Sequence, residues 1–452
     1  MTDLLSATPP PSAPPALPDR SCDLEVASSA PSLMPADAAP APAPAADGHK
    51  PPLLILATPD WDGTYMKSTV ALAGELAAHY QVLYVEHPPT HLSTARDVAA
   101  GRKPPSEIVR RAPRVRRVRA RCGTSVDVLT PPSVWPINRL PRRLYEPVLA
   151  RNARRVRDAV QPWLDRLGMQ SPLVLNALNP HYGVALADAF DEVGRVYYCY
   201  DEVRARDWNG RHGDRMEEHY LEMVGAAIGS SPALHARLKT QTETAFLVPN
   251  GVDFSLFHRA FPAGAPTGQA PTAGGESGPS PCFGYVGSLD DRVDYRLLHR
   301  LAERRPDAHL RLVGRIVDPQ ARTLERHPNV TLTGPKSPED LPAELRAMDV
   351  GLIPFVRDAF TRCIYPLKAN EYLAAGLPVV STAFADLSLL QPVVTVAQTA
   401  GQFLEAVREV LRPHQTSGAE RRRRARVAAS NRWSVRAEKV RTVLERVRTG
   451  TT

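Results

Sequence analysis

Short, continuous apolar runs recur along this chain, and a segment long enough for a helix separates each run from the next. The first run is PLLILATP (Pro52–Pro59), and the second is QVLYVEHP (Gln81–Pro88). Between them, Tyr65–His79 has apolar residues at helical spacing. Runs of this length bounded by turn residues are typical of buried strands. Strand, helix and strand within about 35 residues form a βαβ unit, which predicts a parallel sheet.

The same pattern continues in two series on either side of a stretch rich in Gly, Pro and Ser, Pro262–Pro281. The further strands expected before this stretch are Pro172–Pro180, Arg195–Glu202, Ala226–Pro232 and Ala245–Gly251. Those expected after it are Cys282–Ser288, Ala308–Gly314, Val330–Gly334, Asp349–Phe355 and Gly376–Thr382. A chain of 452 residues exceeds one ordinary core. We therefore predict an α/β protein of two Rossmann-like, parallel-sheet domains facing a cleft, where ligands usually bind.

The composition of the chain, together with its strand pattern, suggests where each domain begins and ends. Thirteen of the 45 prolines fall within the first 52 residues, among alanines and serines, so residues 1–50 are expected to form a disordered tail. The first domain is assigned to residues 51–258, a flexible linker to 259–281, the second domain to 282–416 and a closing helical segment to 417–452.

Five scattered cysteines, without a CxxC pair or metal-ligand spacing, favour a reduced, cytoplasmic protein without a bound metal. The start of the chain lacks the pattern of a secretory signal, and no apolar run reaches the roughly 18 residues that span a bilayer. The net charge of +8 suits an anionic ligand or an acidic membrane surface, although an arginine-rich composition alone also produces it.

The most informative stretch is RCIYPLKANEYLAAGLPVVST (Arg362–Thr382). Pro366 suits the first turn of a helix that Gly376 ends, and a strand follows. Lys368 and Glu371 share one face of this helix. Lys368 would strengthen the attraction of the helix N-terminus for a phosphate, and Glu371 could accept hydrogen bonds from a ribose diol. An ordinary ion pair on a solvated helix is about as plausible from the spacing.

The sequence P-L-K-x-x-E-Y-L-A-A-G-L-P-V-V-S-T resembles the nucleotide-sugar signature of GT-B glycosyltransferases of the family 4-like group. The nearest resemblance is to bacterial surface-polysaccharide enzymes of the teichuronic-acid type. Further stretches resemble the same family in order, from residue 52 to residue 447: VYYCYDE, GSSP, Leu247–Phe257, Phe283–Gly314, His327–Phe355 and NRWSVRAEKV. The last of these resembles a closing helix that crosses back to the first domain.

The resemblance implies that a donor diphosphate binds in the cleft against the second domain, with Glu371 on the ribose hydroxyls. The other donor-binding positions that it implies are Gly287, Ser288, Arg292, Tyr365, Pro366 and Leu367. The chain departs from the family in two places. Cys363 stands where a second glutamate is usual, and Ser288 where a basic residue is common. Lys368, Arg315 and Arg292 are the basic side chains left to neutralise the diphosphate.

Polar residues also follow the expected strands of the first domain, where ligands bind in open α/β sheets. Those chosen as acceptor-side candidates are Asp62 and Gly63 of DWDG, His87, His181, Asp201 and Glu202. His181 or Asp201 could orient an acceptor hydroxyl. For Asp62, Gly63, Asp201 and Glu202, turn formation or helix capping is an equally good explanation. For each histidine, a structural or surface role is the more common one.

The segment 102–121 holds nine Lys and Arg residues against one Glu, and RVRRVRAR reads as a strand with a charged face. The charged face of this segment could be exposed to solvent, bind an anionic membrane or bind nucleic acid. No aromatic interleaving supports nucleic acid, so none is expected as a partner.

These observations predict an enzyme that moves a sugar from a nucleoside diphosphate sugar to a hydroxyl of a glycan or lipid-linked acceptor. UDP or GDP is the expected nucleotide, and no other cofactor is expected. The resemblance implies retention of configuration without a metal, with Lys368, Arg315, Asp201 and His181 as the catalytic candidates. A cytoplasmic location, with peripheral contact to the inner face of the plasma membrane as an option, fits such an acceptor. The alternatives are a non-catalytic nucleotide-sugar-binding scaffold and, less favoured, a nucleotide-sugar epimerase.

Overall fold

The computed structural model describes residues 50–451 except 64, 204–206 and 262–279. Nearly all of the expected tail 1–50 and most of the expected linker 259–281 therefore lie outside the described residues.

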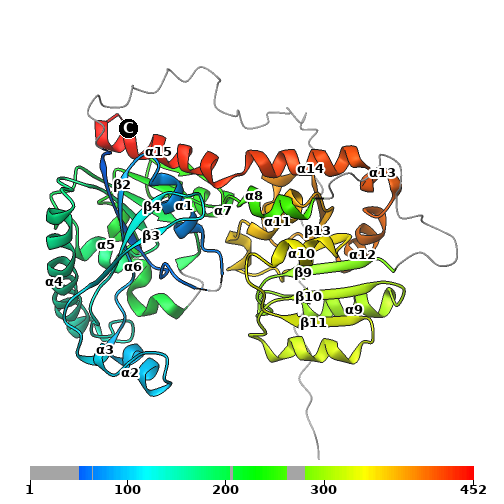
Figure 1. Ribbon diagram of the computed structural model, residues 1–452, viewed down its shortest axis with the longest axis horizontal. Helices are drawn as coiled ribbons and strands as arrows, with labels where there is room; N and C mark the ends of the chain where they lie inside the picture. Colours follow the sequence, from blue (N-terminus) through cyan, green and yellow to red (C-terminus); the bar gives the residue numbers. More distant parts are fainter. Residues whose placement is uncertain (1–49, 64, 204–206, 262–279, 452) are drawn as a thin grey trace, which may run out of the picture. The chain divides into compact units, whose positions relative to one another are not determined.

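The first sheet has eight strands in the order β3-β4-β2-β1-β5-β6-β7-β8 among the described residues. Figure 1 labels its strands β2, β3 and β4. All neighbouring pairs are parallel except β3 and β4, which are antiparallel. The strands are β1 (Pro52–Ala57), β2 (Gln81–Val85), β3 (Arg114–Arg119), β4 (Ser125–Thr130), β5 (Leu173–Ala177), β6 (Gly194–Cys199), β7 (Ala226–Gly229) and β8 (Ala245–Leu247). The central strands β1 and β5 are buried on both faces, which explains their continuous apolar sequences.

Helices cover both faces of this sheet. On one face α4 packs Val156 and Val160 against Leu54 and Val85. On the other face α1 and the C-terminal helix α15 share a core with β1, β2 and β5. The helices that belong to this sheet are α1 (Ser68–Leu76), α2 (His91–Ala99), α3 (Ser106–Val109), α4 (Arg142–Arg166), α5 (Pro180–Ala185), α6 (Gly213–Leu221), α7 (Pro232–Lys239) and α15 (Trp433–Thr449). No helix within the described ranges is both long and apolar enough to cross a membrane.

The second sheet has six parallel strands in the order β11-β10-β9-β12-β13-β14 among the described residues. These strands are β9 (Cys282–Val286), β10 (His309–Val313), β11 (Val330–Gly334), β12 (Val350–Ile353), β13 (Val379–Thr382) and β14 (Val394–Ala397). The helices around it are α8 (Phe254–Phe257), α9 (Tyr295–Arg304), α10 (Leu341–Arg346), α11 (Leu367–Ala374), α12 (Ala400–Glu409), α13 (Pro413–Thr416) and α14 (Gly418–Ser430).

The chain passes between the two sheets twice, and the two passages lie side by side. In the first passage the backbone N–H of Val252 donates to the carbonyl of Asn431 at 3.0 Å, and the N–H of Trp433 donates back to the Val252 carbonyl at 3.3 Å. Gly251 leaves room for the indole, since a Cβ there would lie 2.7 Å from the Trp433 ring. The side chain of Asn431 donates to Asn370 of α11 at 2.9 Å. The passages are therefore bound to each other and to α11.

The structure confirms two parallel-sheet, Rossmann-like domains and differs from the expectations in detail. Residues 252–260, placed with the first domain and the linker, contribute Val252, Leu256 and Phe257 to the core of the second sheet. Helix α14 packs against α11, whereas α15 packs on α1 and β6, so the chain returns to the first sheet near residue 431 rather than 417. β3 is the charged strand expected within residues 114–121, whereas its antiparallel partner β4 was not expected.

The return of α15 gives a first prediction. Leu444→Ala removes a side chain with no exposure in the core between α15 and the first sheet. We expect a loss of about 2–5 kcal/mol in the free energy of unfolding, because a cavity is added to the lost burial. Chemical denaturation measures it. Thr442→Ala, on the exposed side of the same helix, should change stability by less than about 0.5 kcal/mol. Equal effects at the two positions would show that α15 does not contribute to the core.

Candidate active site

Helix α11 begins at Leu367, with Pro366 as its N-cap residue rather than within its first turn. Gly376 ends it as expected, with a φ of +77° and its N–H donating to the Leu373 carbonyl at 2.9 Å. Lys368 and Glu371 lie one turn apart and are both half-buried. No ion pair within 4.0 Å joins either of them to another described residue, so the simple surface ion pair that the spacing allowed is absent there.

The amino group of Lys368 lies between aromatic rings and a glycine loop. Its Nζ is 4.4 Å from the ring centre of Phe355 and 5.2 Å from that of Tyr285. Burial, followed by repulsion from Arg292, lowers the pKa of Lys368 well below its usual value. A half-buried ammonium without an ion pair is costly, and the charges of Glu371 and Asp290 offset this cost only in part, so an anion beside it would be stabilised.

The loop after β9 provides the other side of this position. Gly287 has a φ of +148°, and a Cβ there would lie 3.2 Å from Cε of Lys368. The neighbouring Gly314 has a φ of +155°, and a Cβ there would lie only 1.8 Å from the Gly287 carbonyl oxygen. Both positions favour glycine through their backbone conformation, and Gly314 requires it for space as well. The Ser288 carbonyl accepts a hydrogen bond from the Tyr285 hydroxyl at 2.8 Å, which fixes the same loop.

The two arginine candidates differ in their surroundings. Arg292 is held by Asp290, with its NH2 group 2.6 Å from Oδ2, and it lies over the Phe355 ring at 5.5 Å. Its charge is therefore largely neutralised. Arg315 is exposed after β10 and lies over the ring of Tyr65, a residue of the first domain, at 5.8 Å. Among the described residues Arg315 has no acidic partner.

The carboxylate of Glu371 faces the first domain. It lines a small cavity together with Leu367 of the same helix and with Lys67, Gly251 and Trp433. Burial raises the pKa of Glu371, and the charge of Lys368 opposes this rise. No hydrogen bond to this carboxylate is made by the described residues. Tyr365 is buried before the helix, and its carbonyl accepts from Asn250 at 3.3 Å.

Cys363 and Glu202 meet although 161 residues separate them. The thiol Sγ lies 3.5 Å from Oε2 of Glu202 and is buried among residues of the first domain. Burial, reinforced by Glu202, raises the pKa of Cys363 to about 11. Glu202 also lies 3.3 Å from Nε of Arg237, whose NH1 group is 2.6 Å from the buried Glu217. Glu202 is thus part of a buried charge network that links the domains.

His87 and His181 lie together at the carboxyl ends of β2 and β5. Burial, followed by repulsion from His181, lowers the pKa of His87 to about 4, so its ring is neutral near pH 7. Nδ1 of His181 lies 2.6 Å from the hydroxyl of Tyr145, which itself stacks on His212 at 3.9 Å. Asp201 follows β6, and its negative charge contributes to raising the pKa of Arg292 in the second domain.

The DWDG loop is fixed by the first domain itself. Lys67 donates to the carbonyls of Asp60 and Asp62 at 2.6 Å, and its amino group occupies the space that Gly63 leaves open. The carboxylate of Asp62 pairs with Arg116 at 2.8 Å. These contacts describe a structural turn at Asp62 and Gly63.

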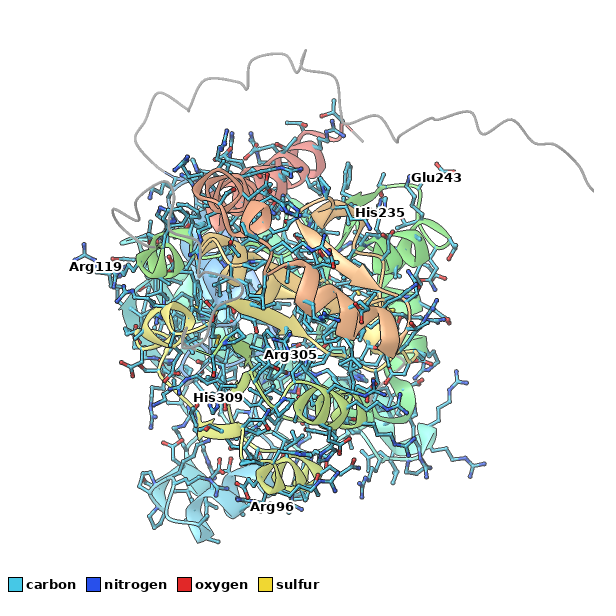
Figure 2. The ribbon with its side chains drawn as sticks, turned by 90° about the vertical axis from the view of Figure 1, so that its right-hand side faces the viewer. Arg96, Arg119, His235, Glu243, Arg305 and His309 are labelled. Carbon is cyan, nitrogen blue, oxygen red and sulfur yellow. The ribbon has the colours of Figure 1, made fainter. Side chains whose placement is uncertain are left out.

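Most of the basic segment is paired with acid. Arg116 lies 3.0 Å from the buried Glu86, Arg117 2.7 Å from Asp127, and Arg121 2.6 Å from Glu339 of the second domain. Arg119 is exposed and points outward from the end of β3 (Figure 2). The four cysteines of the described residues, Cys122, Cys199, Cys282 and Cys363, are free thiols. The described residues contain no group of three or more His, Cys, Asp or Glu side chains arranged to hold a metal.

Two Rossmann-like, parallel-sheet domains in one chain are the architecture of the GT-B class of fold, and comparison with solved structures supports this assignment. Sucrose-phosphate synthase from Thermosynechococcus elongatus superimposes with a TM-score of 0.63 at 16% identity, over 89% of this chain and all of that one. A UDP-forming trehalose-phosphate synthase from Burkholderia vietnamiensis gives 0.63 at 14% identity, over 87% and 97%. Anabaena HepE in complex with UDP gives 0.56 at 13% identity, over 87% and 99%.

Residues 280–412 match the model of the family described as Glycosyl transferases group 1. Over 183 residues the chain is 29% identical to a protein of Bacillus subtilis (strain 168) assigned by name to teichuronic acid biosynthesis as the glycosyltransferase TuaH. That match spans 39% of this chain and 44% of the relative, less than half the length of either.

The buried network at Arg237 gives a second prediction. Arg237→Met leaves Glu217, which has no exposure, and the buried Glu202 without their cation. We expect a loss of about 3–5 kcal/mol in the free energy of unfolding, measured by denaturant titration. The double variant Arg237→Met/Glu217→Met should recover much of this loss, because it removes the uncompensated carboxylate as well. If the single variant is as stable as the parent chain, the network does not hold the domains.

Proposed function

We propose that this protein is a glycosyltransferase that moves a sugar from a nucleoside diphosphate sugar to an acceptor hydroxyl. The observation that carries the proposal is the pair on α11: a lysine at a glycine loop and, one turn away, a carboxylate, neither of which has an ion pair or a hydrogen bond from its charged group among the described residues. A phosphate satisfies the first and a ribose diol satisfies the second. The named function of the Bacillus subtilis relative and the UDP bound in the HepE structure support the same choice.

In this proposal Lys368 and the free N–H groups of the α11 N-terminus stabilise the charge that develops on the leaving diphosphate. The Gly287 and Ser288 backbone approaches the phosphates, and Tyr365, Pro366 and Leu367 line the donor side. Arg292 supports the site through Phe355 rather than as a free charge. Arg315 is the cation at the rim.

These groups supply charge stabilisation from the chain itself, which supports the metal-independent reaction that the family resemblance implies. Retention of configuration is proposed from that resemblance alone. His181 and Asp201 are proposed to orient the acceptor hydroxyl from the first domain, with His87 as a neutral hydrogen-bonding group beside them. A glycan acceptor, alone or linked to a lipid, and a cytoplasmic setting fit the relative's named pathway and the free thiols.

A binding protein without turnover is the second candidate, and Cys363 favours it. Its thiol is buried against Glu202 and does not carry the charge of the glutamate usual in the family. Glu202 brings a carboxylate to the same position, although its charge is shared with Arg237.

A thermal-shift panel of UDP, GDP, ADP, TDP and CMP tests the proposal. A nucleotide present at 100 times its dissociation constant should add about 2.7 kcal/mol of stability. We expect one diphosphate to raise the melting temperature, and Glu371→Ala and Lys368→Ala to reduce the shift. Ala substitution at the exposed Arg346 is the control. Binding without turnover of any donor would favour the scaffold, and no shift in a cooperatively melting protein would refute the donor site.

The lowered pKa of Lys368 makes diphosphate binding dependent on pH. Between neutral pH and the ordinary lysine pKa near 10.5, the unliganded lysine loses its proton, whereas a bound diphosphate favours the charged form. Affinity should therefore fall as pH rises from 7 to 9, by at most about tenfold per pH unit for one linked proton. Titration calorimetry measures this slope. Lys368→Arg, which stays charged, should flatten it; an equal slope in both proteins would assign the effect to another group.

A further inference from the structure

A second concave site lies on the first domain, away from Lys368 and Glu371. It has a volume of about 430 Å³ and lies between α4, the start of α2 and the loops before β3 and after β4. Its lining includes four arginines and two rings: Arg111, Arg151, Arg154, Arg155, His91 and Trp135. We refer to it as the four-arginine pocket.

The four guanidinium groups have no acidic or hydrogen-bonding partner among the described residues, whereas their neighbours Arg110, Arg116 and Arg117 are all paired. Nε of Arg155 is buried without a partner. The acidic residue in the lining is Asp158, whose Oδ1 lies 3.2 Å from Arg157. Like charges gathered in a hollow repel one another, so this arrangement is stabilised when an anion with more than one charge enters it.

A fixed aromatic surface lies beside these charges. The Trp135 side chain is 54% exposed, yet its backbone is held from both sides by the buried Asn152, which accepts from its N–H at 3.1 Å and donates to its carbonyl at 2.8 Å. Its ring meets the His91 ring edge-on at 5.1 Å. Guanidinium groups match phosphate oxygens in pairs, and a rigid indole offers a face for the body of the same ligand.

The pocket lies along the same edge of the sheet as the acceptor candidates. His91 and Trp135 follow β2 and β4, whereas His181 follows β5 and Asp201 follows β6. The order β4-β2-β1-β5-β6 places the ends of β4 and β6 four strand spacings apart, roughly 19 Å at about 4.8 Å each. A ligand that reaches both places is extended and carries its anionic group far from the hydroxyl near Asp201.

We propose that the four-arginine pocket binds a phosphate or diphosphate group carried by the acceptor, at the end opposite the hydroxyl that receives the sugar. This inference rests on the proposed function, because the acceptor side is assigned there. It names the acceptor class as an extended, phosphate-bearing saccharide.

Calorimetric titration with inorganic pyrophosphate tests the pocket. The full chain with Lys368→Ala serves as background, so that the donor site does not compete for the probe. We expect Arg151→Gln/Arg155→Gln to weaken binding at least tenfold. The matched control Arg143→Gln/Arg166→Gln removes two exposed arginines of the same helix that lie outside the pocket, and it should stay within twofold of the background protein. Equal affinity in the pocket and control variants would overturn the proposal.

Two further measurements are needed. One distinguishes an acceptor phosphate from a lipid headgroup as the anion, and the other tests the proposed function separately from the pocket. Sedimentation with vesicles of phosphatidylglycerol in phosphatidylcholine is run on the same variants. Loss of vesicle binding in the pocket variant, without any difference toward pyrophosphate, would overturn the acceptor assignment in favour of a lipid headgroup. The UDP thermal shift, measured with Lys368 intact, should survive in the pocket variant. Absence of that shift in every protein would count against glycosyl transfer, while the pyrophosphate titration still decides the pocket.

Discussion

The position of the candidate active site depends on the two passages of chain that lie side by side between the sheets. Their mutual backbone hydrogen bonds, the indole of Trp433 over Gly251 and the amide pair Asn431–Asn370 tie helix α11 to the C-terminal helix. Arg436 completes this chain by donating to Asn431. Because α15 is anchored in the core of the first sheet, the helix that bears Lys368 and Glu371 is positioned by both domains at once.

The candidate active site on α11 contains two charged side chains, Lys368 and Glu371, that form no ion pair within 4.0 Å among the described residues. Burial lowers the pKa of Lys368 and raises that of Glu371, and each shift records a cost of keeping the charged form away from water. Arg292 has its own counterion in Asp290, and Arg237 pairs with two glutamates. Charged side chains on α11 and in the four-arginine pocket have no such ion pair among the described residues, and ligands are expected at both places.

Sequence patterns predicted the features that are local in the chain. Continuous apolar strands such as β1 and β9, and the shared face of Lys368 and Glu371, follow from residue spacing alone. β4 has polar residues at three of its six positions, and β14 has only four residues, one of them an exposed threonine, so their apolar signals are weak. The contact of Cys363 with Glu202 and the convergence of Arg111 with Arg151 and Arg155 depend on tertiary packing between distant segments, which spacing does not encode. The neutral state of His87 likewise follows from burial.

The contact between Gly314 and Gly287 ties the shape of one loop to the sequence of another. With 1.8 Å between the place of a Cβ at 314 and the Gly287 carbonyl oxygen, even a methyl group would force the two strand ends apart. Hydrophobic patterning would be unchanged by such a substitution, so a homologous chain could retain every signal of this fold and yet lose the close approach of the loop to Lys368. In comparing such chains, the residue at 314 is therefore as informative about the proposed donor site as the charged residues on α11.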